Sequence, residues 1–325
     1  MEQMRLVEEA EGGEGSEQSD ELQFSAGKRL HLAHDEPSLL AGQKLGLKNG
    51  LPWFFDAEDR VMMLRGINLS GSVKLPATPF QPSHVLEGFY EMRNDVSFVG
   101  RPFPLDQADE HFARLHRWGF NFLRFNVTWE ALEHQGPGQY DDEYIEYVIE
   151  ILKKAEQYNF LVCIDPHQDV WSRFCGGSGA PAWALEAAGF DVERLHASKA
   201  CVLHSEDPAV TARQPMLWVT NYQKLAAATM FTLFFGGRVF APELTAVCRL
   251  PGGPHEGEEM SLQDFLQRHF AEALSRLARR VVAAGLGSTV VGYGSLNEPS
   301  GGYLGTPHLH PEEGAGSRQE LRLGL

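Results

Sequence analysis

Apolar runs that alternate with amphipathic helical segments are the feature of this chain that most restricts its fold. The runs cover residues 61–70, 120–127, 160–165 and 288–296. Helical patterns lie between them at residues 105–118, 141–158 and 261–284. Strands separated by helices form a parallel sheet, because each crossover helix returns the chain to the same end of the sheet. The sequence therefore predicts an α/β fold.

The helical segments carry their own boundary and packing signals. Apolar residues of the segment 105–118 recur at spacings of three, and Gly119 follows as a stop signal. Ser261-Leu-Gln-Asp264 has the pattern of a capping box, and Gly285 marks the end of the helix that it opens. In the segment 141–158, the apolar residues that share one helical face are Ile145, Val148, Ile149 and Leu152.

Charge restricts the classes of partner. The formal net charge of −16 argues against nucleic acid and anionic membrane surfaces, which attract basic proteins, and favours a neutral substrate such as a glycoside. Residues 1–25 hold eight acidic residues and one basic residue, a local charge of −7, so we expect residues 1–45 to form an acidic, disordered tail. This start has no basic and apolar secretory signal, which predicts a cytoplasmic protein.

The most apolar segment is also informative. Residues 225–236 are shorter than the about 20 residues that span a bilayer, so this stretch predicts a buried helix rather than a transmembrane segment.

Polar residues follow the apolar runs closely. In a parallel α/β fold, the carboxyl ends of the strands meet at one edge of the sheet, where barrel enzymes place their active sites. The residues at these predicted strand ends are Arg65 and Asn68, Arg124, Asp165 with His167 and Asp169, and Asn297 with Glu298. Their convergence predicts one site.

Each of these side chains has a role in sugar chemistry. Glu298 follows a packed strand and is the candidate general acid, since a buried carboxyl group can carry a proton near neutral pH. We expect Asn297 to bind a 2-hydroxyl group, and His167 and Asp169 to hydrogen-bond other sugar hydroxyls. Arg124 would keep a second carboxylate ionised. Each residue could instead be a structural polar group, and for Arg124 the alternative is a buried ion pair.

Further alternatives concern neighbouring residues. Asp165, His167 and Asp169 could bind a metal, but no further ligand is evident, so we expect neither a metal nor a cofactor. Trp129 and Trp171 could stack on a sugar or lipid, or could pack in the core. Glu130 could substitute for the second carboxylate, or could belong to an ordinary loop or helix start.

Four longer segments add a family resemblance: Leu64–Pro76, Phe98–Leu105, Ile164–Arg173 and Thr220–Phe235. With Arg124, His167 and Asn297-Glu298-Pro299 in this order, the chain resembles glycoside hydrolase family 5. The resemblance is to the fungal steryl β-glucosidase and glucosylceramidase branch, which is related to endoglycoceramidases.

The resemblance implies a (β/α)8 TIM barrel with Glu298 as acid/base catalyst. It also implies a glucose subsite that includes His167, Asp169 and Asn297, which Lys74 would reach as well. The family's nucleophile is a glutamate on strand seven, without a counterpart here. We therefore expect residues 46–305 to be the N-terminal part of a barrel truncated after about the fourth strand, with an insertion at about 171–260 and an irregular tail at 306–325.

The expected activity is that of a retaining β-glucosidase on a neutral glycolipid, either sterylglucoside or glucosylceramide, with transient contact to a membrane surface. Without the nucleophile strand, this chain is expected to be inactive. One alternative is a non-catalytic fragment that binds a sugar or a partner, and another is an endoglycoceramidase-like enzyme.

Overall fold

The computed structural model describes residues 46–47, 53–56, 58–81, 87–203 and 218–306. The chain divides into two compact units, Met1–Met63 and Leu64–Leu325. The predicted acidic tail, and the predicted irregular tail from residue 307 onward, lie outside the described residues.

The smaller unit contains three short antiparallel strands, β1 (Gly46–Leu47), β2 (Phe54–Phe55) and β3 (Val61–Met62). Asp56 organises the turn between β2 and β3, because its Oδ1 accepts hydrogen bonds from the amides of Glu58 (3.0 Å) and Arg60 (2.9 Å).

The apolar run 61–70 is therefore not one strand as predicted. Its first part forms β3, whereas Gly66–Asn68 forms β4 in the larger unit. Met63 between them is 78% exposed. A continuous apolar run gives no signal for the point at which the backbone changes its hydrogen-bonding partner.

The larger unit is built on a four-stranded parallel sheet in the order β4-β5-β6-β9. Strand β5 spans Phe122–Val127, β6 spans Leu161–Pro166 and β9 spans Val290–Tyr293. Arg124 pairs with Asn68 on one side and with Cys163 on the other, which aligns the carboxyl ends of β4, β5 and β6. The prediction of a parallel α/β sheet is confirmed.

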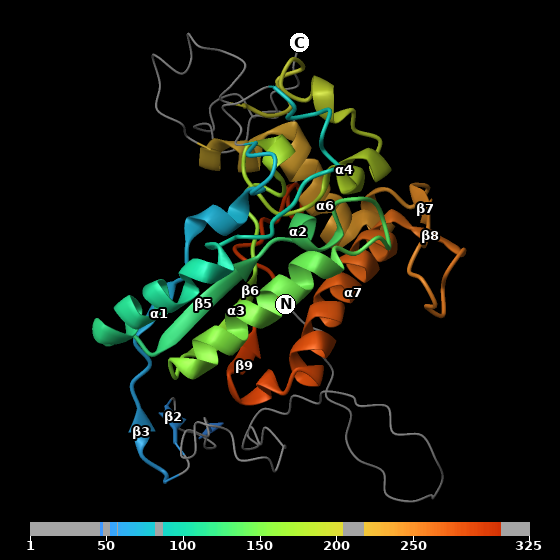
Figure 1. The fold of residues 1–325 in the computed structure, drawn as a ribbon. Coiled ribbons are helices and arrows are strands. Elements are labelled where there is room, and N and C mark those ends of the chain that lie inside the picture. Colours follow the sequence, from blue (N-terminus) through green and yellow to red (C-terminus); the bar gives the residue numbers. More distant parts are fainter. Residues whose placement is uncertain (1–45, 48–52, 57, 82–86, 204–217, 307–325) are drawn as a thin grey trace, which may run out of the picture. The chain divides into compact units, whose positions relative to one another are not determined.

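Three helices cover one face of this sheet (Figure 1): α1 (Ala108–Arg117), α3 (Asp142–Gln157) and α7 (Leu262–Ala283). The predicted capping box is present, since Ser261 Oγ accepts a hydrogen bond from the Asp264 amide at 3.1 Å. Gly119 and Gly285 follow α1 and α7 with positive φ angles of 82° and 75°.

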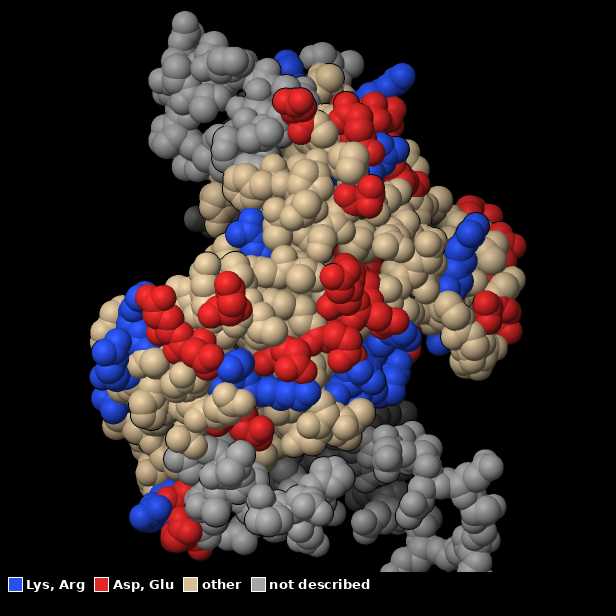
Figure 2. Space-filling view, in the orientation of Figure 1, with Lys and Arg blue, Asp and Glu red and all other residues tan. Residues whose placement is uncertain are grey.

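The inner sides of the helices form the core, and their outer sides carry charge. All four apolar residues predicted to share a face of α3 are buried. Trp118 instead is 66% exposed, because it follows the last residue of α1 and has left the buried face. Figure 2 shows acidic and basic residues in a band over these helices, which includes the pairs Asp142–Arg276 and Lys154–Asp109.

The segment after β6 includes residues 171–260, where the sequence predicts an insertion. Its described part contains α4 (Ala182–Ala187), α6 (Leu225–Phe240) and the hairpin β7 (Thr245–Val247) and β8 (Glu259–Ser261). Helix α6 lies beyond the carboxyl ends of the strands (Figure 1) and confirms the predicted apolar helix. Within the described ranges, no helix has the length and hydropathy needed to cross a bilayer.

Short elements complete the larger unit. Helix α2 (Trp129–Glu133) follows β5 and is capped by Thr128, whose Oγ1 accepts a hydrogen bond from the Ala131 amide. The 3-10 turns are η1 (Gly71–Lys74), η2 (Leu105–Gln107), η3 (Arg173–Cys175), η4 (Val192–Arg194), η5 (Trp218–Gln223) and η6 (Leu286–Ser288).

Candidate functional site

Charged side chains converge at the carboxyl ends of β5 and β6. Arg124 on β5 donates from Nη2 to Asp165 Oδ2 on β6 at 2.8 Å and to Asn297 Oδ1 at 2.6 Å. Asn68 at the end of β4 accepts from Arg124 Nη1 at 3.3 Å. One guanidinium group therefore joins three strand ends, as the parallel register allows. Arg124 is therefore in an ion pair, as the structural alternative expected, but the pair is only partly buried.

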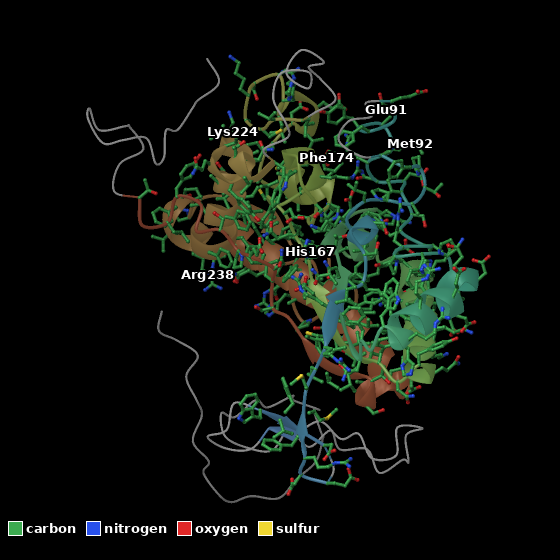
Figure 3. All side chains as sticks on the ribbon, turned by 90° about the vertical axis from the view of Figure 1, so that its left-hand side faces the viewer. Glu91, Met92, His167, Phe174, Lys224 and Arg238 are labelled. Atoms are coloured by element: carbon green, nitrogen blue, oxygen red, sulfur yellow. The ribbon has the colours of Figure 1, made fainter. Side chains whose placement is uncertain are left out.

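His167 lies between two carboxylates directly after β6. Its Nδ1 is 3.0 Å from Asp165 Oδ2, and its Nε2 is 3.2 Å from Asp169 Oδ2. Figure 3 shows His167 among packed side chains in the middle of the larger unit. Burial disfavours the imidazolium ion, but hydrogen bonds to the two carboxylates outweigh it and raise the pKa of His167.

Lys74 joins the same network through Asp169. Its Nζ is 2.7 Å from Asp169 Oδ2, and Ser178 Oγ donates to the same oxygen at 3.3 Å. Burial opposes ionisation of Asp169, but hydrogen bonds from His167 and Lys74 lower the pKa of this carboxyl to about 2. Asp169 is therefore an ionised acceptor at neutral pH.

Asn297 and Glu298 follow β9 and differ in exposure. Asn297 is buried, and its Nδ2 donates to the Gln168 carbonyl at 2.9 Å. Gln168 Nε2 in turn donates to the carbonyl oxygens of Asn297 (2.7 Å) and Glu298 (3.0 Å). These bonds hold Glu298 at a φ of 39°, which is unfavourable for a residue with a side chain.

The Glu298 side chain is exposed, and within the described ranges its carboxylate makes no hydrogen bond or ion pair. Its charge acts on Tyr222. Burial is the main cause that raises the pKa of the Tyr222 phenol, and the Glu298 carboxylate is one of the smaller causes that raise it. Glu298 thus differs from Asp165 and Asp169, which are both paired.

The loop after His167 is tightly packed against the site. Val170 and Trp171 have positive φ angles of 45° and 76°. The backbone of Asp169 exchanges two hydrogen bonds of 2.9 Å with Ser178, so the chain turns back on itself. A Cβ on Gly177 would lie 1.9 Å from the Asp169 carbonyl oxygen. Only glycine fits there, which explains why this loop is glycine-rich.

Four candidates have structural positions instead. Trp129 and Trp171 are buried and pack edge to face at 6.5 Å, so they belong to the core and are not exposed for sugar stacking. Glu130 is buried in an ion pair with Arg173 and is not a free carboxylate. Arg65 precedes β4 and lies at its amino end, where its amide donates to Asn121 Oδ1.

Several site residues carry no strong sequence signal. Gln168 holds the backbone of Asn297 and Glu298, and Asn126 Nδ2 lies 3.1 Å from His167 Nδ1. Tyr222 contacts Gln168 from more than fifty residues away. Position within the segment after β6 could have suggested Gln168, but no local pattern indicates Tyr222. Among the described residues, no cluster of three or more His, Cys, Asp or Glu could hold a metal.

Comparison with known proteins shows which family this chain is similar to. Residues 85–197 match the family described as Cellulase (glycosyl hydrolase family 5). Members of that family have TIM barrels, and the four parallel strands agree with that fold.

Individual relatives match a longer part of the chain. It is 46% identical to a glucosylceramidase of Aspergillus fumigatus over 277 residues, covering 83% of this chain and 34% of the relative. It is 41% identical to an ergosteryl-beta-glucosidase of Saccharomyces cerevisiae, covering 83% and 36% respectively. The chain therefore spans about a third of the length of these curated relatives.

A solved structure agrees with the sequence relatives. The crystal structure of Cryptococcus neoformans sterylglucosidase 1 superposes with a TM-score of 0.72 at 44% identity, covering 80% of this chain and 36% of the sterylglucosidase. A barrel truncated after about the fourth strand stays a prediction.

Acidification should remove stabilisation that the Asp169 carboxylate provides. Its pKa of about 2 in the folded state lies below the ordinary value of 3.8, so the unfolded state binds more protons between these values. Stability should therefore be complete above about pH 4 and should fall as the pH decreases towards about 2. Urea titrations should show a shallower slope of unfolding free energy against pH for Asp169→Asn in this window.

Asp106→Asn is the matched control, because Asp106 is exposed and the substitution is chemically identical. Its slope should equal that of the unsubstituted protein. Equal slopes for all three proteins would contradict the ion-pair network around Asp169.

Proposed function

We propose that this chain carries the glucose-binding and acid/base part of a retaining β-glucosidase that acts on lipid glucosides. The observation that supports this most is the paired network of Arg124, His167, Asp169 and Lys74 beside the unpaired, exposed carboxylate of Glu298. The names glucosylceramidase and ergosteryl-beta-glucosidase of two relatives suggest the substrate class.

The proposed chemistry divides the roles among these residues. Glu298 protonates the glycosidic oxygen as the lipid leaves and then removes a proton from the water that attacks the glucosyl intermediate. Asp169 is an ionised acceptor for a sugar hydroxyl, and Lys74 and His167 orient it from two sides. Asn297 Nδ2 has a second hydrogen for the 2-hydroxyl group, since its bond to Gln168 uses only one.

Retention of configuration needs a second carboxylate about 5 Å from the acid/base residue. Asp165 and Asp169 are engaged in ion pairs, and Glu130 is buried against Arg173. We therefore propose that the described residues do not supply the nucleophile and do not complete catalysis by themselves. Arg124 would face the second carboxylate and keep it ionised.

Helix α6 offers a reason for a lipid substrate. Its residues Phe231 and Phe234 pack against Trp171 at 5.3 and 5.5 Å, directly behind the site. From Lys224 to Arg238 the helix passes His167 (Figure 3), and its last turns expose Phe235, Val239 and Phe240. Exposed apolar side chains beside a sugar site suit the lipid part of a glycolipid or brief contact with a membrane surface.

Binding of a glucose-derived basic iminosugar tests the proposed sugar site without requiring turnover. We expect calorimetry to detect binding to the chain. Asp169→Asn should weaken it about 10- to 100-fold, because a hydrogen bond to a charged group is lost. Asp106→Asn should leave the affinity unchanged. Absence of binding to the folded chain would contradict the proposed site.

Hydrolysis of ergosteryl glucoside and glucosylceramide tests the proposed catalytic roles. We expect no turnover by the chain above the buffer rate. Turnover that disappears in Glu298→Gln would show that a nucleophile is present after all, whereas turnover that survives this change would contradict the role of Glu298. Cleavage of a longer glycosphingolipid with release of the whole oligosaccharide would favour the endoglycoceramidase-like alternative.

A further inference from the structure

A cavity of about 750 Å³ lies apart from the strand-end site, between the start of α3, the loop 250–254 and the outer side of α7. None of the residues that line it belongs to the network of Arg124, His167 and Asp169. Its volume is within the range of about 300–1,000 Å³ typical of small-molecule sites.

Arginine dominates the charge of this cavity. Its wall contains Arg268, Arg276 and Arg279 of α7, against the acidic residues Asp142 and Glu272. Arg276 binds Asp142 through two hydrogen bonds of 2.9 and 2.7 Å, and Arg279 pairs with Glu272. Arg268 remains. It makes no hydrogen bond or ion pair within the described part of the chain, and its charge is one of the smaller causes that lower the pKa of Asp264, one helical turn before it. A positive wall is unusual in a protein with a net charge of −16.

Two further donors on the wall lack partners within the described ranges. The Tyr140 hydroxyl is buried without a hydrogen bond, and Ser275 lies on α7 one turn from Arg279 and two turns from Arg268. The Arg276 guanidinium lies 4.8 Å from the centre of the Tyr140 ring, which fixes both groups. A buried hydroxyl without a partner costs free energy unless a ligand or water satisfies it.

The opposite wall is suited to a ligand. Residues 250–254 include Pro251 and Pro254, which limit the motion of the loop. Gly252 between them has nothing within 4 Å of the position of a Cβ, so the loop leaves open space on that side.

We propose that this cavity binds a small phosphate ester. A phosphate group has several acceptor oxygens and can use the unpaired guanidinium of Arg268 together with the Ser275 hydroxyl. A neutral sugar would leave the Arg268 charge unpaired. A nucleic acid would meet the carboxylates of Asp142 and Glu272, which form part of the cavity wall.

Calorimetric titration of the full chain at low salt tests the proposal with ribose 5-phosphate, which avoids any glucose-binding site. We expect ribose 5-phosphate to bind and ribose not to bind. Arg268→Ala should weaken binding about tenfold or more, and Ser275→Ala by a smaller factor, because each removes a donor to the phosphate. Raising the salt concentration should weaken binding as well.

Arg194→Ala is the control, because it also removes one exposed positive charge but lies outside the cavity. Its affinity should be unchanged, and circular dichroism should show that all variants are folded. The proposal is overturned if ribose 5-phosphate does not bind, or if neither cavity variant changes its affinity. Equal affinity for inorganic phosphate would also overturn it, since the cavity would then recognise only an anion. Iminosugar binding should be unchanged in Arg268→Ala, which would show that a loss of ribose 5-phosphate binding does not arise at the proposed sugar site.

Discussion

Replacing Arg173 with methionine should lower the free energy of unfolding by about 3–5 kcal/mol, the usual result of removing one partner of a buried ion pair. Arg173 is completely buried, and its Nε donates to Glu130 Oε1 at 2.7 Å. Its guanidinium also lies 4.2 Å from the centre of the Phe174 ring. Methionine can fill much of the space but leaves Glu130 without its cation.

The pH dependence of this loss identifies its cause. Burial already raises the pKa of Glu130, and Arg173 only partly opposes this effect. In Arg173→Met the folded state should therefore bind a proton more readily than the unfolded state, so stability should fall as the pH rises above about 4.5. Urea denaturation at pH 5 and pH 8 should show the larger loss at pH 8.

The double variant Glu130→Gln/Arg173→Met is the control. It removes both charges, so it should be about 2 kcal/mol more stable than Arg173→Met at pH 8. A single-variant loss below about 1 kcal/mol would show that the ion pair is not needed for stability.

Gly177→Ala should destabilise the fold by about 3 kcal/mol or more and should weaken iminosugar binding at least about tenfold. The new methyl group would lie 1.9 Å from the Asp169 carbonyl oxygen and 2.5 Å from Val170 Cγ2. Because the first of these atoms is backbone, Asp169 itself must move. Its carboxylate would then lose its contacts with Lys74 Nζ and His167 Nε2.

Gly287→Ala is the matched control for this prediction. Nothing lies within 4 Å of a Cβ at Gly287, so the same substitution should change stability by less than about 0.5 kcal/mol. It should not affect iminosugar binding. Comparable losses in both variants would mean that the close packing of the loop on Asp169 is not the cause.

The periodic part of the fold was predictable from local pattern. Strands β5 and β9 and helices α1, α3 and α7 lie within the segments that periodicity and capping signals indicate, and β6 extends one residue beyond its segment. The error at residues 61–70 arose because β3 and β4 share one apolar run but pair with strands in different units. Pairing partners are distant in sequence, so no local pattern shows the change.

The candidate site was predictable only in part, and for a related reason. His167, Asp169 and Asn297 follow apolar runs, Arg124 lies within one, and the four residues form one network. Trp129 and Glu130 also lie close to a strand end, but α2 buries both of them. Position after a strand indicates which residues are near the edge, whereas the packing of later segments decides which of them remain exposed.

The sequence alone determined the alternation of strands and helices, the resemblance to a family and the residue types available at the strand ends, because these depend on the order of residues along the chain. Tertiary structure decided the pKa values and the hydrogen-bonding partners of the residues at the strand ends. Hydrogen bonds to Asp165 and Asp169 outweigh burial and raise the pKa of His167, and hydrogen bonds from His167 and Lys74 lower that of Asp169. Arg124 is paired with Asp165 and Arg173 with Glu130, whereas the Glu298 carboxylate has no partner within the described residues. These outcomes depend on distances across the fold, which sequence order does not specify.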